Sequence, residues 1–286
     1  MNGIIIKGIG GFYYVKAADD NVYECKARGV FRKMHITPMI GDKVEIEIKN
    51  GKGSISEIKP RSIMLTRPPV ANIDTFVLVV AAANPEPNLF LIDKMLINAE
   101  INGLKPIICI NKTDLTRRTD LEKIYAYYTV INVSAENNEN IDELNSLIQN
   151  KVSAFSGLSG VGKSSLLNLI TNQEMETGEI SEKISRGRHT TRHVELLELQ
   201  SGGFALDTPG FSSLEIEGIK AEELQDYFPE MAEAKNNCRF RGCSHINEPD
   251  CAVKELLNSD KLAKSRYESY KDLYDTLKQI KEWKKK

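Results

Sequence analysis

The spacing of hydrophobic positions along this chain changes near residue 70. Before that point, short segments rich in Val, Ile and Tyr alternate with Gly, Asp and Asn turns, at residues 11–16, 21–26 and 43–48. This is the pattern of short β-strands, and about five of them in so short a segment are typical of a small barrel such as the OB-fold. We therefore predict an N-terminal OB-fold over residues 1–68, bounded by Arg67-Pro68-Pro69 because proline interrupts a strand ladder.

After Asn72 the pattern becomes one of strands alternating with helices, which implies a parallel sheet covered by helices on both faces. The expected strands cover residues 75–81, 106–110, 129–133, 194–199 and 204–206, and the expected helices cover residues 89–102, 121–128, 141–148 and 163–170. The fold class is therefore α/β, with this second domain over residues 69–215. A third domain, residues 216–286, is expected to end in a long amphipathic helix over residues 261–286 with a basic end.

Residues 157–164, with the sequence GLSGVGKS, fit the P-loop pattern G-x-x-x-x-G-K-[ST]. Its glycines let backbone amides face phosphate oxygens, and the following helix adds its positive N-terminal end. Lys163 is expected to place its charge on the β- and γ-phosphates, and the Ser164 hydroxyl to bind Mg²⁺. The predicted nucleotide-binding residues of this loop are Gly157, Leu158, Ser159, Gly160, Val161, Gly162, Lys163, Ser164 and Ser165.

Two other motifs indicate that the base is guanine. Asn111-Lys112-Thr113-Asp114 follows a predicted strand, as a loop at the carboxyl end of a parallel strand should. The Asp114 carboxylate can accept hydrogen bonds from the ring N–H and the exocyclic amine of guanine, two donors that adenine lacks. Ser134-Ala135 follows the next strand and fits the second base-contacting loop. GTP is therefore the expected nucleotide.

A fourth motif, Asp207-Thr208-Pro209-Gly210, fits the DxxG pattern after the last predicted strand. Asp207 is expected to hold Mg²⁺ through water, and the Gly210 amide to reach the γ-phosphate. Thr190 and Thr191 are both candidates for the switch I threonine that binds Mg²⁺, and the sequence does not choose between them.

The order of these motifs is unusual. An ordinary small GTPase has its P-loop first, whereas here the two base-reading motifs precede the P-loop and DxxG comes last. Since the cyclic order is kept, we predict a circular permutation, which is permitted because the termini of a compact domain often lie close together. The chain after Gly210 then continues directly from the loop that contacts the γ-phosphate.

A cluster of possible metal ligands lies near the C-terminus. Cys238, Cys243, His245 and Cys251 have the spacing C-x4-C-x-H-x5-C, and three thiolates with one imidazole are the ligand set of a tetrahedral Zn²⁺ site. Four protein ligands leave no position for water, so we expect a structural metal; the alternative is four unrelated residues in a loop. The cysteines at positions 25 and 109 lie in strand-like segments and are expected to be small buried hydrophobic residues.

The permuted order, the sequence GRHTTR at residues 187–192, the β-rich N-terminal segment and the Cys/His cluster together resemble the RsgA family of bacterial ribosome small subunit-dependent GTPases. The resemblance covers essentially the whole chain. It implies an OB-fold, a permuted GTPase domain and a zinc domain that act late in maturation of the 30S subunit, with GTP hydrolysis stimulated by that subunit. The implied partners are GTP or GDP, the 30S subunit and its 16S rRNA, and we expect a monomer.

Hydrolysis also needs a residue that orients the attacking water. Many GTPases have a glutamine just after DxxG, but this chain has Phe211, which cannot orient water. His189 is the best candidate, because a neutral imidazole can orient water or accept its proton. The alternative is that His189 contacts RNA or loop backbone. We therefore predict His189 and Lys163 as the catalytic residues.

The net charge of −2 over 286 residues does not indicate a nucleic-acid partner, but the distribution of charge does. Residues 1–68 contain 12 Lys and Arg against 7 Asp and Glu, residues 69–260 contain 17 against 29, and residues 261–286 contain 9 against 4. Basic ends suggest that the appended domains contact phosphate backbones. In the barrel, the candidate RNA contacts are Lys26, Arg28, Arg32, Lys33, Tyr13, Tyr14, Tyr23 and Phe31, although at least half of the aromatic residues are expected to be core.

Membrane association is not expected. No apolar run approaches the roughly 18 residues of a spanning helix, and residues 1–11 lack a signal-peptide cleavage pattern, so we expect a cytoplasmic protein. Two other functions stay open: a nucleotide-gated RNA-binding switch in which hydrolysis is incidental, and a GTPase that acts on a membrane or on tRNA. Phosphate release with and without 30S subunits separates the first from a partner-activated enzyme.

Overall fold

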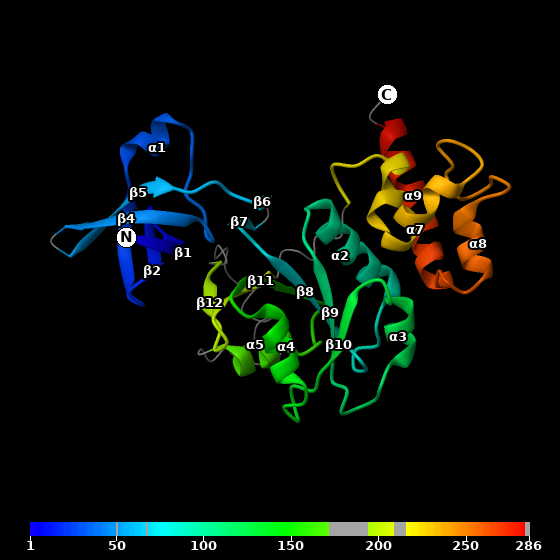
Figure 1. Cartoon of the computed structure of the whole chain (residues 1–286), viewed down its shortest axis with the longest axis horizontal. Helices are drawn as coiled ribbons and strands as arrows, with labels where there is room; N and C mark the ends of the chain where they lie inside the picture. Colours follow the sequence, from blue (N-terminus) through cyan, green and yellow to red (C-terminus); the bar gives the residue numbers. More distant parts are fainter. Residues whose placement is uncertain (50, 67, 172–193, 209–215, 284–286) are drawn as a thin grey trace.

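The computed structural model describes residues 1–49, 51–66, 68–171, 194–208 and 216–283. Figure 1 shows a small barrel, a central α/β part and a helical C-terminal part, which follow one another in chain order. Five residues with predicted or discussed roles in hydrolysis lie outside the described residues: His189, Thr190, Thr191, Gly210 and Phe211.

The N-terminal part is a closed barrel with the strand order β1-β2-β3-β5-β4, completed by antiparallel pairing of β4 with β1. Inward-facing side chains from different strands meet in its core, and Ile5, Val15, Cys25 and Ile55 are each 0% exposed. The barrel predicted from the sequence is thus confirmed. Its elements are β1 (Asn2–Ile9), β2 (Phe12–Ala17), β3 (Val22–Ala27), α1 (Gly29–Lys33), β4 (Lys43–Lys49) and β5 (Lys52–Ile58).

The candidate RNA-binding side chains of the barrel divide into exposed and core residues. Phe31 is 7% exposed and belongs to the core, and Tyr13 and Tyr23 pack partly against it. Tyr14 donates a hydrogen bond from its hydroxyl to Glu24 on the barrel surface. The predicted phosphate-binding residues are all exposed, namely Lys26, Arg28, Arg32 and Lys33.

The barrel is joined to the central part by both backbone and ion pairs. The hairpin of β6 (Met64–Thr66) and β7 (Pro69–Ala71) follows the barrel, and Pro69 stands at the start of its strand, where proline is tolerated. Lys7 in β1 pairs with Glu195 over 2.6 Å, and Lys16 in β2 pairs with Glu198 over 3.1 Å. These pairs join the barrel to the edge of the central sheet.

The central sheet has the strand order β10-β9-β8-β11-β13-β12. Neighbouring strands run parallel except that β12 is antiparallel to β13, because the short turn at residues 199–203 leaves no room for a crossover. The expected α/β fold is confirmed, with this one antiparallel edge strand. The strands are β8 (Thr75–Ala81), β9 (Pro106–Asn111), β10 (Thr129–Asn132), β11 (Lys151–Ser156), β12 (Leu196–Glu198) and β13 (Gly203–Asp207).

Helices cover both faces of this sheet, and β8 shows why. Phe76, Leu78 and Val80 belong to the core on the side of α2 and α3, whereas Val77 and Val79 belong to the core on the side of α4 and α5. Every residue of β8 is buried, as expected for a strand in the middle of a parallel sheet. The helices are α2 (Leu89–Ile101), α3 (Thr119–Ile124), α4 (Ile141–Ile148) and α5 (Lys163–Ile170).

One predicted helix, at residues 121–128, is shorter than expected. Helix α3 starts at Thr119 and ends at Ile124. The aromatic residues that follow have low helix propensity. Tyr125 is 1% exposed and packs against Arg266, whose guanidinium lies 5.6 Å from the centre of the Tyr125 ring. Tertiary packing therefore ends this helix early.

The C-terminal part is a compact set of helices packed on α2. Its core includes Leu224, Phe228, Met231 and Tyr270, and it also takes in Ile97 from α2. None of the described helices is long and apolar enough to cross a membrane. The elements of this part are η2 (Ala221–Tyr227), α7 (Pro229–Ala234), η3 (Lys235–Asn237), α8 (Ala252–Asn258) and α9 (Lys264–Trp283).

Candidate nucleotide-binding site and metal centre

The predicted nucleotide-binding motifs follow neighbouring strands of the central sheet. The strands β9, β11 and β13 run parallel to one another within it, and β10 extends it at one edge. Since the carboxyl ends of parallel strands meet at one edge, residues 111–114, 134–135, 157–165 and 207–208 gather there, although they are far apart in the sequence. This is the edge at which α/β folds bind their ligands.

Two glycines of the P-loop are required by close backbone packing. A Cβ at Gly157 would lie 2.5 Å from the carbonyl oxygen of Val79 in β8. Gly162 has φ +87°, and a Cβ there would lie 2.3 Å from Nδ2 of Asn111. Any other residue at these positions would displace the loop, so the glycines fix the loop's path over the sheet.

Asn111 and Lys112 hold the P-loop through its carbonyl groups. The side-chain amide of Asn111 donates to the Val161 carbonyl over 3.0 Å, and Lys112 Nζ donates to the Gly160 carbonyl over 2.7 Å. Lys112 also donates to the carbonyl of Asn84. Two carbonyls of the loop are thereby engaged by the protein, and an anion would be bound by its backbone amides.

The two loops that are predicted to read the base are joined by hydrogen bonds between them. Ser134 donates from its hydroxyl to Oδ1 of Asp114 over 2.6 Å, and the Ala135 amide donates to the side-chain oxygen of Asn111 over 3.0 Å. The Thr113 hydroxyl donates to the Val133 carbonyl over 2.9 Å. These bonds set the position of the Asp114 carboxylate relative to the P-loop.

Lys163 and Asp207 contact each other directly. Lys163 Nζ donates to Oδ1 of Asp207 over 2.5 Å, between the start of α5 and the end of β13. The Thr208 hydroxyl donates to the Phe155 carbonyl over 2.8 Å and holds this end of β13 against β11. The groups predicted to bind phosphate and Mg²⁺ are therefore adjacent, and Ser164 and Ser165 lie half-buried beside them.

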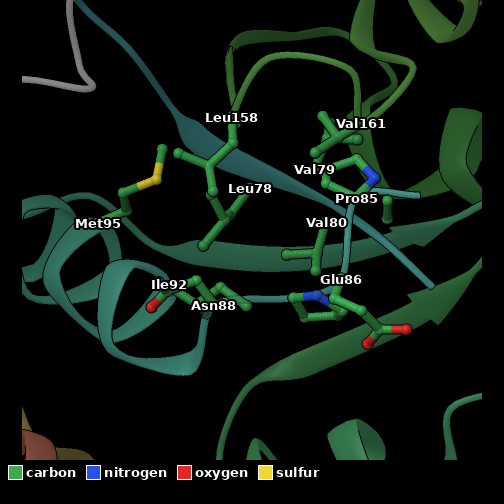
Figure 2. Close-up of a pocket in the computed structure, with 12 residues that line it drawn as sticks. Leu78, Val79, Val80, Pro85, Glu86, Asn88, Ile92, Met95, Leu158 and Val161 are labelled. Atoms are coloured by element: carbon green, nitrogen blue, oxygen red, sulfur yellow. The ribbon is translucent and has the colours of Figure 1, made fainter. Parts of the chain in front are cut away.

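The P-loop also has an apolar anchor (Figure 2). Leu158 and Val161 of the loop line an apolar pocket, together with Leu78 and Val79 of β8 and Met95 of α2. Ser159 and Gly160 are exposed, so the apolar residues of the loop face the protein and its small polar residues face solvent. The loop is thus fixed from beneath by packing as well as by hydrogen bonds.

The sequence analysis missed the loop after β8. Asn84 accepts from Lys112, its peptide bond to Pro85 is cis, and Pro85 lines the pocket beneath the P-loop. The signal was available, because an Asn-Pro turn just after a buried strand lies at the same edge as the other motifs.

The structure brings the four predicted metal ligands together. The ligand atoms of Cys238, Cys243, His245 and Cys251 all lie within 4.8 Å of one another. Nδ1 of His245 is 3.3 Å from the Cys251 sulfur and 3.6 Å from the Cys238 sulfur. A tetrahedral zinc with bonds of about 2.0 Å to nitrogen and 2.3 Å to sulfur requires separations of this size.

The chemistry of this donor set also fits a soft divalent cation. Burial raises the pKa of the Cys243 thiol to about 12 and also raises that of Cys251, whereas burial lowers the pKa of His245. Neutral imidazole is the form that binds metals, and a cation supplies the charge that stabilises buried thiolates. The residues therefore fit a metal centre.

Glu248 shapes the loop that carries His245. Its carboxylate accepts hydrogen bonds from the amide and hydroxyl of Ser244 and from the amides of Ile246 and Asn247. These bonds hold His245 at φ +62°, in the left-handed region that non-glycine residues seldom occupy.

Comparison with known proteins decides the family. The RsgA GTPase family model matches residues 58–217, which is more than half of the chain, and the RsgA N-terminal domain model matches residues 2–55. The chain belongs to the RsgA family. Members of this family are GTPases, so the protein is an enzyme that hydrolyses GTP.

Individual relatives match almost the whole of this chain. It is 48% identical to the small ribosomal subunit biogenesis GTPase RsgA of Caldanaerobacter subterraneus subsp. tengcongensis over 293 aligned residues, covering 100% of this chain and 98% of the relative. The crystal structure of YjeQ from Thermotoga maritima matches with a TM-score of 0.84 and 38% identity, over 96% of this chain and 98% of that one.

A second solved structure bears on the order of the motifs. YloQ, described as a circularly permuted GTPase, matches with a TM-score of 0.81 and 39% identity, over 98% of this chain and 95% of that one. The permutation predicted from the sequence is confirmed, because this chain matches the structure of a circularly permuted GTPase over almost its whole length.

Proposed function

We propose that this protein is a GTPase of small ribosomal subunit biogenesis, which binds the 30S subunit, assists its late maturation and hydrolyses GTP faster when the subunit is bound. The observation that carries this proposal is the meeting of the base-reading and phosphate-binding motifs at one edge of a permuted sheet, in a chain whose relatives are named for this role. We propose that it acts in the cytoplasm as a monomer and contacts 16S rRNA.

The nucleotide site assigns a role to each described motif. Asp114 accepts from guanine, and the amides of the P-loop bind the phosphates. Lys163 now pairs with Asp207, and GTP with Mg²⁺ would separate them: Lys163 would bind the β- and γ-phosphates, and Asp207 would bind Mg²⁺ through water. Ser164 completes the Mg²⁺ site, with Thr190 or Thr191 from outside the described residues.

Hydrolysis itself is assigned to His189 on the sequence alone. Phe211 offers no polar group, so a neutral imidazole at position 189 is proposed to orient the water. His189→Ala should then keep GTP and 30S binding but lose the stimulated rate, as expected for a group that acts in the transition state.

The three domains are proposed to run over residues 1–68, 69–215 and 216–286. The cluster of Cys238, Cys243, His245 and Cys251 is proposed to hold one structural Zn²⁺. The exposed basic residues of the barrel are proposed to bind rRNA phosphates, so affinity for 30S should fall steeply as salt rises.

Phosphate release measured with and without purified 30S subunits tests the function. We expect a low rate alone, a higher rate with 30S, and no stimulation with 50S subunits. The affinity for 30S should also be higher with a non-hydrolysable GTP analogue than with GDP. A nucleotide-gated RNA binder would show the affinity difference without stimulated release, and a GTPase of another pathway would show neither.

Metal analysis tests the zinc assignment separately. One equivalent of zinc should copurify with protein prepared without chelator, and Cys243→Ser should lose it, because metal binding and folding are coupled in such small sites. Protein that retains no metal would contradict the assignment.

A further inference from the structure

The imidazole of His245 has two nitrogens, and the structure gives each of them a different environment. Nδ1 faces the sulfurs of Cys238 and Cys251. Nε2 points the other way and lies 2.6 Å from Oε1 of Gln225 in η2, a residue 20 positions earlier in the chain. Gln225 is not a metal ligand, so this contact belongs to the surroundings of the centre.

The orientation of the Gln225 amide is fixed by a second hydrogen bond. Its nitrogen donates to the Glu222 carbonyl over 2.9 Å, within η2. The oxygen of the amide is therefore the atom turned toward His245, and an oxygen can only accept. Nε2 of His245 must then carry the proton, which leaves the Nδ1 lone pair for the metal.

We propose that Gln225 is a positioning residue of the metal centre: it fixes the tautomer and the ring orientation of His245, and through it the bound zinc holds η2 in place. This rests on the zinc assignment proposed above. Partners of this kind beyond the ligands themselves are known to change metal affinity by about 10- to 100-fold when they are removed.

Because η2 packs in the C-terminal core, its contact with His245 links the metal centre to that core. Ala221 and Leu224 of η2 are buried in the C-terminal core, and Gln225 is half-buried beside them. Among the described elements, η2 is also the first helix after β13. The backbone of His245 is held separately, since its carbonyl accepts from the Tyr267 hydroxyl over 2.6 Å. Gln225 is thus the described link from the ligand's ring to η2.

Two substitutions of similar size separate positioning from packing. Gln225→Glu keeps an oxygen that accepts from Nε2, whereas Gln225→Met keeps the length and removes the acceptor. Competition with a chromophoric zinc chelator should show a loss of affinity of about 10- to 100-fold for Gln225→Met and a smaller loss for Gln225→Glu. Asn236→Ala is the control and should keep the parent affinity, because Asn236 is exposed and lines the same pocket as Gln225 and His245.

Two further measurements report on the tautomer and on η2. In the zinc-loaded parent, ¹H–¹⁵N correlations of the His245 ring should show a metal-bound Nδ1 and a protonated Nε2. Hydrogen exchange of the amides at residues 221–227 should be slow in the zinc-loaded parent and fast in zinc-saturated Gln225→Met.

The outcomes are distinguishable. If the parent protein bound no zinc, both the zinc assignment and the role of Gln225 would be contradicted. Tight zinc binding by the parent with unchanged affinity and exchange in Gln225→Met, or metal bound through Nε2, would overturn the role of Gln225 while leaving the zinc and the GTPase function intact.

Discussion

Arg266 in α9 donates a hydrogen bond from Nη1 to Oδ1 of Asp93 in α2 over 2.7 Å, although the two residues lie 173 positions apart. Their side chains are 1% and 0% exposed. The same guanidinium makes two hydrogen bonds to Glu230, at 2.7 and 3.1 Å, and lies 4.6 Å from the ring centre of Phe228. This buried ion pair fastens the C-terminal helices to the GTPase part.

Removing one partner of this pair should be strongly destabilising. Arg266→Met leaves two buried carboxylates without their cation, and we expect the free energy of unfolding of the C-terminal part to fall by about 3–5 kcal/mol. Denaturant unfolding, monitored through hydrogen exchange of the amides in α9, measures this loss of free energy.

The control for Arg266 uses a surface pair in the same helix. Lys264 and Glu268 are 3.8 Å apart and 82% and 54% exposed, so Lys264→Met should cost no more than about 0.5 kcal/mol. Equal losses for both substitutions would mean that burial of the Arg266 charge does not matter.

The base-reading prediction concerns Asp114. Asp114→Asn should weaken GTP binding and favour xanthosine triphosphate, whose 2-oxo group can accept from an amide donor. The Ser134 hydroxyl, which now donates to Asp114, can still donate to an amide oxygen, so the fold should be unaffected. Competition binding with GTP, ATP and xanthosine triphosphate measures this, and equal affinity of the parent for ATP and GTP would refute the guanine assignment.

The phosphate prediction concerns Lys163 and Ser164. Either Lys163→Ala or Ser164→Ala should reduce the rate of GTP hydrolysis by at least about 100-fold, because these groups are proposed to act on phosphate and Mg²⁺. Circular dichroism should show an intact fold. Lys151→Ala, an exposed lysine at the opposite end of β11, is the control and should leave turnover unchanged. Normal turnover in both site variants would exclude the P-loop assignment.

The pH prediction concerns Glu248. Burial opposes its ionisation, but the hydrogen bonds from Ser244 and Ile246 outweigh burial and lower the pKa of this carboxyl to about 2. Because the folded pKa lies below the ordinary value of 4.5, the ionised group adds stability above about pH 4.5 and loses that contribution as the pH falls toward 2.

Glu248→Gln tests this through the difference in melting temperature between parent and variant, measured as a function of pH. The melting temperature of the C-terminal part should be lower in the variant than in the parent at pH 6, and the gap should narrow as the pH falls toward 2. Loss of zinc in acid affects both proteins, so the difference isolates Glu248. A gap that does not change with pH would show that the carboxylate charge has no role.

The sequence predicted those parts of the fold that depend on local patterns. Strand β8 and helices α4 and α5 have the predicted bounds, since each has a clear period and is bounded by turn residues. The Cys/His cluster was visible because its four ligands lie within 14 residues.

Contacts between distant segments left no local signal. Arg266 and Asp93 appear in the sequence as ordinary charged residues on predicted helices, and only packing shows that both are buried. Gln225 is equally inconspicuous, because its partner His245 is 20 positions away. The predicted length of α3 was wrong for the same reason, because Tyr125 lies outside the helix and packs against the Arg266 guanidinium.

The circular permutation also sets the sequence of events during synthesis of the chain. Strands β8, β9 and β10 are translated before β11 and β13, and β9 and β10 precede the loops that are proposed to read guanine. In the complete sheet β8 pairs with both β9 and β11. During synthesis, the edge of β8 that pairs with β11 therefore stays unpaired until β11 has been translated. If Asp207 holds Mg²⁺ as proposed, GTP with Mg²⁺ should stabilise the nascent chain fully only after Asp207 has been made. Full nucleotide affinity would then be expected only after translation has passed β13.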